Sequence, residues 1–341
     1  MRRRLTGGRW AGALPLLAWG MALVAPANAE RHDSRAKLPE ARAEFVTLGT
    51  GGGPLARLDR SQPSNALGVG DAVYLFDVGD GVQRQMVAAS LRLRDVRAIF
   101  VSHHHIDHNG DLAPLLVTRW LFNNHEIVPV IGPPGTVWMV EQIASAYRAT
   151  ELAPITIGGP KKPAIAKSVA GRDLAHTLNE PAVVYEDDAV RVLAVANAHY
   201  HFAVGSEEDR FARSYSFRVE TAQRTFVYTG DTGPSENVVK LAADAAVLVS
   251  EVIDLAAMGS VLRRARDIPA SALAPMLAHM EQDHLTPVQV GRLAAKANVK
   301  RVVLTHLAPG MDDEEGTTGY IKGIAGSYSG PVSVAHDLDR F

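Results

Sequence analysis

The residues best suited to chemistry lie close together: four histidines and one aspartate occupy the six positions from His103 to His108. They follow a short apolar run, Ala98 to Val101, of the kind that forms a buried strand. The loop after a strand lies at one rim of a sheet, where its side chains can converge on a point. Neutral imidazole and carboxylate are ligands that zinc accepts, and two neighbouring ions can share one bridging hydroxide. The segment therefore predicts a site for two metal ions with hydrolytic chemistry.

Successive side chains of this segment should point to opposite sides, which separates its histidines into two sets. In an extended chain His103 and His105 point to one side and His104 to the other, so His104 is left out of the predicted site. Asp107 and His108 can turn toward a second, neighbouring ion. The competing interpretation is a polar loop that traps metal by accident, which a lone histidine would favour and this dense cluster disfavours.

Two later residues are candidate ligands because each comes just after an expected strand. Asp231 lies in a Gly-Asp-Thr-Gly turn after the strand Thr225 to Tyr228, and His306 follows the strand Val302 to Leu304. The alternatives are ordinary ones. Asp231 could be a turn or helix-cap aspartate, and His306 a hydrogen-bonded loop histidine.

The segment 197–201 offers two histidines, His199 and His201, on the same side of an extended chain. His199 is preferred for its position after the preceding strand, and His201 would then be a substrate-side or surface residue. The choice between them stays open. The glycine-rich turn Gly49 to Pro54 lacks the lysine-serine ending of a phosphate loop, so it is expected to join strands and to bind no cofactor.

With these residues in view, the His-x-His-x-Asp-His pattern resembles the signature of the metallo-β-lactamase superfamily. Within it the chain is similar to the ribonuclease Z-like and arylsulfatase-like branch. The likeness runs from about Phe45 to the C-terminus through four further motifs: Leu75 to Met86, Tyr228 to Thr232, His284 to Pro287 and Leu304 to Leu307. It implies an α/β fold, a four-layer αββα sandwich with the metals at one edge.

The resemblance also implies a role for each candidate. One Zn²⁺ would be held by His103, His105 and His199, the other by Asp107, His108 and His306, and Asp231 would bridge them; other divalent metals would suit the same ligands. Catalysis would use a metal-bridging hydroxide that Asp107 orients, and His284, paired with Glu251, would protonate the leaving group. The alternatives are a surface carboxylate for Glu251 and a helix N-terminal residue for His284.

Periodicity predicts the elements that must position these residues. Strands are expected at 44–48, 73–76, 98–101, 189–194, 214–220, 225–228, 246–249 and 302–304, and helices at 82–91, 112–121, 136–149, 237–243, 271–280 and 287–297. Some paired strands are joined too tightly for a helix between them, which favours a layered α/β sandwich over a purely parallel sheet. The Gly-, Pro- and Lys-rich segment 158–172 is expected to be an exposed loop or arm.

The N-terminus has the three parts of a secretory signal: arginines at the start, an apolar run from Trp10 to Ala25, and Ala27-Asn28-Ala29 before Glu30. We expect a signal peptide over residues 1–29 cleaved after Ala29, a flexible leader over 30–42, and one hydrolase domain over 43–341. The protein would then be periplasmic or secreted, with no stable membrane span. An uncleaved anchor is the alternative, and the sequence does not distinguish Sec from twin-arginine export.

Charge and composition limit the choice of substrate. Cleavage would remove four arginines and no acid from a chain of 35 basic and 37 acidic residues, leaving a net charge of about −6. Such a chain is poorly suited to nucleic acid, which makes that partner unlikely at this stage. With no cysteine, the metals must be held by nitrogen and oxygen.

The leading hypothesis is therefore an exported binuclear zinc hydrolase of a small ester: a phosphodiester, sulfate ester or lactone. The alternatives are a ribonuclease Z-type 3′-tRNA-processing endonuclease and a non-catalytic metal-binding module. The sequence leaves homodimerisation open.

Overall fold

The computed structural model describes residues 42–122, 124–153, 161–265, 269–310 and 318–341. The predicted signal peptide and almost all of the predicted leader lie outside these residues, so cleavage, export and the domain boundary at residue 43 stay predictions. None of the helices in the described ranges has the length and apolar character needed to cross a bilayer.

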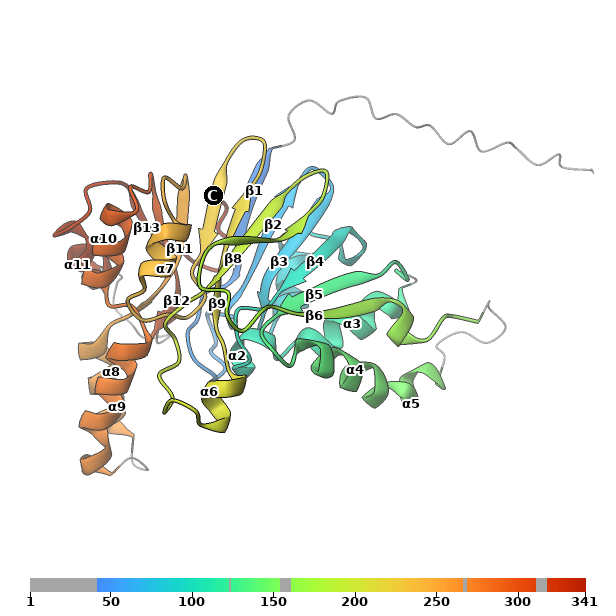
Figure 1. The fold of residues 1–341 in the computed structure, drawn as a ribbon, viewed down its shortest axis with the longest axis horizontal. Coiled ribbons are helices and arrows are strands. Elements are labelled where there is room, and N and C mark those ends of the chain that lie inside the picture. The colour runs from blue at the N-terminus through green and yellow to red at the C-terminus, as the bar shows by residue number, and fades with distance from the viewer. Residues whose placement is uncertain (1–41, 123, 154–160, 266–268, 311–317) are drawn as a thin grey trace, which may run out of the picture. The chain divides into compact units, whose positions relative to one another are not determined.

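Two β-sheets form the centre of the fold (Figure 1). The first has the strand order β1-β2-β3-β4-β5-β6 and the second β13-β12-β11-β10-β9-β8-β7. The first contains β1 Ala43–Gly49, β2 Ser64–Val69, β3 Ala72–Val78, β4 Val96–Phe100, β5 Val128–Gly132 and β6 Val169–Asp173. The second contains β7 Ala182–Glu186, β8 Arg191–Ala196, β9 Tyr215–Glu220, β10 Thr225–Tyr228, β11 Val247–Ile253, β12 Val302–Ala308 and β13 Val332–Val334. In each sheet the earlier strands pair antiparallel and the later ones parallel.

The core between the sheets is aromatic. Along β3, Tyr74 and Phe76 face the other sheet while Val73 and Leu75 face the helices, as the alternation of a strand requires. The Phe76 and Phe100 rings stack with centroids 4.9 Å apart. Because both faces of each sheet are covered, the central strands are apolar almost throughout, and burial of these faces is the main force that holds the layers together.

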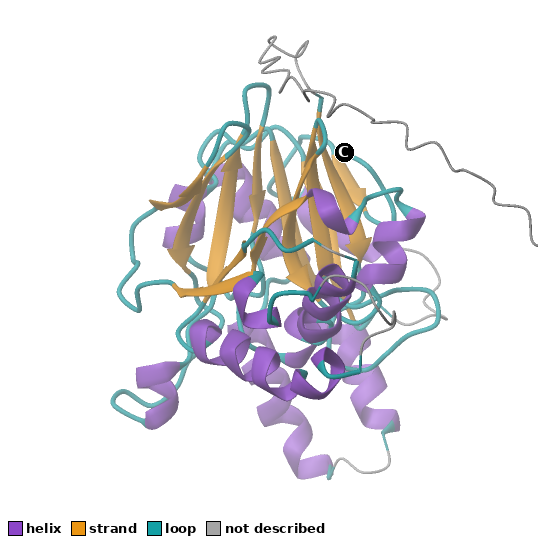
Figure 2. Cartoon of the chain, turned by 90° about the vertical axis from the view of Figure 1, so that its right-hand side faces the viewer, coloured by secondary structure: helices purple, strands orange, loops and turns teal. Residues whose placement is uncertain are grey.

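Helices cover the outer faces, which completes four layers (Figure 2). The first sheet packs against α1 Val82–Ala88, α3 Leu112–Leu121 and α4 Thr136–Ala146, and the second against α7 Glu236–Leu241, α10 Pro287–Lys296 and α11 Thr318–Ala325. Shorter helices are α2 Ile106–Asn109, α5 Arg148–Glu151 and α6 Glu207–Phe211. The predicted αββα sandwich is confirmed.

A helical hairpin leaves the second sheet between β11 and α10. It consists of α8 Leu255–Arg264 and α9 Ala270–Asp283, which lie against each other and extend away from the sheets in Figure 1. Asp254 caps α8 by accepting the backbone N–H groups of Ala256 and Ala257. The chain leaves α9 directly into His284, so the base of the hairpin carries one of the predicted catalytic residues.

Several sequence-based boundaries were wrong. The segment 158–172 was expected to be a loop or arm, but Val169 onward forms β6, which pairs in parallel with β5. Residues 154–160 lie outside the described chain. β11 and β12 are longer than predicted, so Glu251 and His306 lie within strands and not after them. β2, β5, β7 and β13 and the helices α2, α6, α8 and α11 were not predicted.

Candidate metal centre

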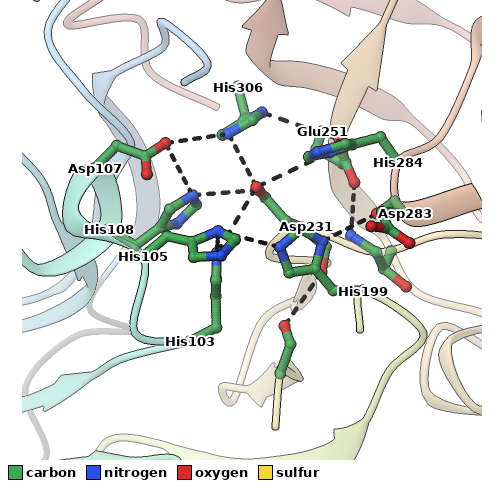
Figure 3. A network of polar contacts seen from close by, with 12 residues as sticks. His103, His105, Asp107, His108, His199, Asp231, Glu251, Asp283, His284 and His306 are labelled. Carbon is green, nitrogen blue, oxygen red and sulfur yellow. Dashed lines mark hydrogen bonds and ion pairs between the residues drawn. The ribbon is translucent and has the colours of Figure 1, made fainter. Parts of the chain in front are cut away.

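All seven predicted ligands come together at one edge of the sheets, and so does the predicted proton-donor pair, His284 and Glu251 (Figure 3). The first sheet contributes four ligands from one stretch after β4. The second contributes single residues: His199 after β8, Asp231 after β10 and His306 within β12. Glu251 lies in β11, and His284 follows α9.

The stretch after β4 turns at once into a short helix, and this places its ligands. His105, with extended backbone angles, is the last residue before α2, so Asp107 and His108 lie in the first turn of that helix. His103 Nε2 lies 2.9 Å from His105 Nδ1. His104 faces the other way, 3.5 Å from the Thr136 hydroxyl, which agrees with its omission from the predicted site.

Asp231 is the common neighbour of the two ligand groups. One of its carboxylate oxygens, Oδ1, lies 3.3 Å from His108 Nε2. The other, Oδ2, lies 3.2 Å from His306 Nε2 and 3.9 Å from His103 Nε2. Its side chain is almost completely buried. Both oxygens therefore face the group of His108 and His306, and Oδ2 also lies on the side of His103, so this carboxylate stands between the two groups, as a bridging ligand would.

His306 reaches the site through an irregularity in β12. The pairing of β11 with β12 shifts register beside Glu251, and His306 has a φ of 45°, in the left-handed region. A bulge of this kind redirects a side chain that a regular strand would point elsewhere. Gly52 makes room for it, because a Cβ atom there would stand 2.8 Å from His306 Nδ1.

Asp77, in the first sheet, also lies at an irregularity of its strand, and its role was not predicted from the sequence. It lies at a register shift in β3 with a φ of 57°. Its carboxylate accepts hydrogen bonds from Tyr228 Oη at 2.7 Å, from the Ser102 backbone N–H at 2.7 Å, and from His108 Nδ1 at 2.8 Å. A carboxylate on the outer nitrogen of a ligating histidine fixes the ring and directs the other nitrogen to the metal.

Glu251 and His284 form a pair beside the ligands. Glu251 Oε2 lies 2.8 Å from His284 Nδ1, and Glu251 Oε1 accepts the backbone N–H of Thr232 at 2.6 Å. Glu251 is fully buried, whereas the His284 side chain keeps 18% of its surface exposed. Burial alone would lower the pKa of His284, but the Glu251 carboxylate outweighs burial and raises it. The protonated imidazolium is the form that can donate a proton.

The structure brings His199, and not His201, into the ligand cluster. His199 Nε2 lies 3.3 Å from His105 Nδ1, and its Nδ1 is bonded to the backbone carbonyl of Asp283 at 3.0 Å. His201 Nδ1 instead meets the carboxylate of Asp283 at 2.7 Å. Asp283, which ends α9, was not identified from sequence. It links the hairpin to a candidate ligand.

Electrostatics distinguishes the two groups of histidines. Burial lowers the pKa of His199 to about 3 and that of His103 well below its usual value, so both are neutral imidazoles, the form that binds metal. For His306, burial would lower the pKa, but the neighbouring carboxylates of Asp231 and Asp107 raise it to about 10. A metal would displace the proton shared there.

The residues fit a pair of divalent ions. His108 Nε2, Asp231 Oδ1 and both His306 ring nitrogens are buried atoms that make no hydrogen bond of normal geometry with the described residues. Leaving such atoms unpaired is costly unless a ligand satisfies them. In the described residues, three sets of donor atoms are close enough to surround one ion: His103, His105, His199 and Asp231; Asp107, His108 and His306; and Asp231, Glu251, His284 and His306. The first two are the predicted pair of sites, and the third joins the Glu251–His284 pair to Asp231 and His306. An all-nitrogen-and-oxygen donor set of this kind suits zinc.

Comparison with known proteins supports the same interpretation. The family model described as the beta-lactamase superfamily domain matches residues 73–307. The chain is 30% identical over 281 residues to a ribonuclease Z of Mycobacterium sp. (strain KMS), across 79% of this chain and 87% of that protein.

Two solved structures share the fold. The metallo-beta-lactamase fold protein YhfI from Bacillus subtilis matches with a TM-score of 0.61 and 17% identity, over 88% of this chain and 98% of that one. The short form of human tRNase Z matches with a TM-score of 0.59 and 20% identity, over 87% and 98%.

Proposed function

The chain belongs to the metallo-β-lactamase superfamily and is a metal-dependent hydrolase, and from this premise we propose that it cleaves phosphodiester bonds in the manner of ribonuclease Z. The sequence alone favours an exported hydrolase of small esters and disfavours nucleic acid as a partner. The relatives favour the alternative, because curated proteins that match most of this chain, such as that of Mycobacterium sp. (strain KMS), are named ribonuclease Z. They also favour an enzyme over a non-catalytic metal-binding module.

The observation that carries the proposal is the pairing of His284 with Glu251 beside the two ligand groups. Hydrolysis of an RNA-type phosphodiester expels an alkoxide, which is a poor leaving group and needs a proton in the transition state. Glu251 occupies His284 Nδ1 and leaves Nε2 to give that proton. A lactone or β-lactam hydrolase has less need of a buried acid pair at this position.

The other residues of the site would bind the ions and orient the attacking water molecule. His103, His105 and His199 would bind one ion, Asp107, His108 and His306 the other, and Asp231 both. When bound, two divalent ions would polarise the phosphoryl group and lower the pKa of an attacking water molecule. Asp107 would orient that water. Asp77 would keep the His108 ring in place throughout.

A direct assay tests the proposal. Zinc-loaded protein is incubated with a precursor tRNA that carries a 3′ trailer, with thymidine 5′-(p-nitrophenyl phosphate), and with an aryl sulfate and a lactone. We expect turnover of the phosphodiesters, with the sulfate and lactone much slower. Hydrolysis of the lactone or sulfate alone would overturn the proposal.

A second candidate, a small phosphodiester in place of tRNA, is supported by the residues that flank the ligands. Ile106, between two ligand positions, is 62% exposed, and Val204, in the loop after His199, is 99% exposed. Apolar side chains here add nothing to the attraction of a polyanion, which relies on Lys and Arg. Cleavage of the thymidine diester without cleavage or gel retardation of the precursor tRNA at low salt would select this candidate.

Export is a separate proposal that rests on the N-terminal sequence alone. Sequencing the N-terminus of protein recovered from a periplasmic fraction would reveal Glu30 as the first residue if cleavage follows Ala29. A retained Met1 would refute it. Homodimerisation stays open.

A further inference from the structure

Two aromatic rings continue outward from the ligand cluster. Tyr200 directly follows the candidate ligand His199, and its ring centroid lies 4.7 Å from that of His199 and 5.4 Å from that of His105. Phe202 stacks on Tyr200, with centroids 5.1 Å apart and planes inclined by 24°. The rings form a short column that starts at the ligands and ends at the surface.

The outer ring of this column is only partly covered by the protein. Phe202 keeps 39% of its surface exposed, and the loop around it, residues 201–205, is exposed throughout. Within the described residues, Tyr200 is the aromatic partner of Phe202. A phenylalanine that served only to hold the loop would be expected to be covered completely, because the exposed part of a ring contributes nothing to the free energy gained by burial.

The column has a chemical use at this site. Aromatic faces bind other flat rings by offset stacking, and nucleobases of every kind stack in this way because each has a π-face. A group stacked here would lie next to the ligands and therefore next to the phosphorus under attack. Ile106, which follows His105 in the chain, is a further exposed apolar side chain beside a candidate ligand.

We propose that Tyr200 and Phe202 form a stacking face for a planar ring attached to the scissile phosphate, either a nucleobase or an aryl group. The proposal deepens the phosphodiesterase function of the preceding subsection and rests on it. It makes the enzyme selective for esters with a ring beside the phosphate, whether the ring belongs to an RNA nucleotide or to a small aryl diester.

Binding of monoesters to the zinc-loaded protein tests this without turnover. Isothermal titration calorimetry is used with three ligands that share one phosphate: methyl phosphate, phenyl phosphate and thymidine 5′-monophosphate. We expect the ring-bearing ligands to bind more tightly than methyl phosphate. Phe202→Ala should weaken the binding of those ligands about ten-fold, the order of a lost base stack, and leave methyl phosphate unchanged. Phe202→Trp should retain or strengthen it.

Phe211→Leu is the matched control. Phe211, on α6, is 52% exposed, but its ring lies against Gly135 at the start of α4. We expect this variant to bind all three ligands as the parent protein does. A circular dichroism spectrum and the zinc content show that each variant is folded and loaded, and Phe202→Leu replaces the alanine variant if that one does not fold.

The outcomes separate the two possible rings and the two proposals. Tighter binding of thymidine monophosphate alone assigns the face to a nucleobase, and of phenyl phosphate alone to an aryl group. Equal affinity for all three ligands, or an equal loss for all three in Phe202→Ala, overturns the inference. If Phe202 governs ring binding but no phosphodiester is hydrolysed, the proposed reaction fails and the stacking face stands.

Discussion

The two sheets supply one metal centre in opposite ways. The first sheet gives His103, His105, Asp107 and His108 from one loop and one helical turn after β4. The second gives one residue from each of several strands, so that His199 and His306 are separated by more than a hundred positions and meet only when β8 to β12 are paired. One half of the site is a local structure, and the other is a product of tertiary packing.

The difference shows where each half is vulnerable. Ligands in one loop keep their spacing as long as the loop is held at both ends, and the Asp77 carboxylate holds it by binding Ser102 and His108. Ligands on separate strands depend on register, and His306 depends on the bulge in β12. Asp231 lies between the two halves, so its substitution should reduce activity more than that of any other residue of the site.

Asp231→Asn should therefore cause the largest loss. It removes the negative charge that faces His108 and His306 and the oxygen that would reach both ions. We expect phosphodiester turnover to fall by more than about 10³-fold, the upper range for the loss of one electrostatic group in an active site. Zinc content by atomic emission should fall from two ions per chain. Asp188→Asn, at a carboxylate 80% exposed, is the control and should change neither quantity. Full zinc content in the Asp231 variant would show that the halves bind metal independently.

His284→Ala should rank second, and its effect should depend on the leaving group. Without the proton donor, cleavage that expels an alkoxide should slow by roughly 10²–10⁴-fold. p-Nitrophenolate leaves without protonation, so the same variant should hydrolyse a p-nitrophenyl diester almost as fast as the parent. His336→Ala, whose side chain is 70% exposed, is the control. Equal losses on both substrates would mean that His284 binds metal or substrate instead of donating a proton.

The same contrast explains what the sequence could reveal. The ligands after β4 could be predicted because they lie close together in the sequence and follow a clear apolar strand. Asp231 could be predicted because its Gly-Asp-Thr turn follows a strand whose bounds were predicted correctly. The resemblance to a known family then supplied the assignments of His199, His306, Glu251 and His284, which spacing alone left open.

The features that could not be predicted from the sequence depend on residues far apart in the chain. Asp77 stands 25 positions from Ser102 and 151 from Tyr228, so no local pattern marks its role. The bulge that turns His306 inward requires a left-handed φ in a residue that is not glycine, which strand propensity cannot anticipate. Strand β6 was missed because its Gly- and Lys-rich approach resembles a loop, and pairing with β5 overrides that local preference.

Asp77→Asn should produce an intermediate effect confined to the local half. The amide keeps the shape but brings an N–H₂ group toward hydroxyl and ring donors, so the His108 ring loses its fixed orientation. Changes of such supporting residues typically cost about 10–100-fold in metal affinity or activity. Zinc titration against a competing chelator should show one weakened site and one unchanged. Weakening of both sites to the same degree would contradict the division of the centre into two halves.

Glu251→Gln should have the subtlest effect, a displaced pH profile. Glu251 raises the pKa of His284 against the opposing effect of burial, so the protonated donor survives to higher pH in the parent. Activity on an alkyl diester should fall as pH rises through this raised pKa, and in the glutamine variant the fall should begin at lower pH. Stability follows the same sign. Because the folded pKa of His284 exceeds its unfolded value of about 6.5, the contribution of the ion pair is complete below that pH, as long as Glu251 is ionised, and is lost as pH rises through the folded pKa. Burial raises the pKa of Glu251, so thermal unfolding of parent and variant should differ most in mildly acidic solution, above the pKa of Glu251, and converge in alkali. A profile unchanged in position would show that the alkaline limit is set by the ligand cluster that both halves build, and not by the pair that the second sheet adds.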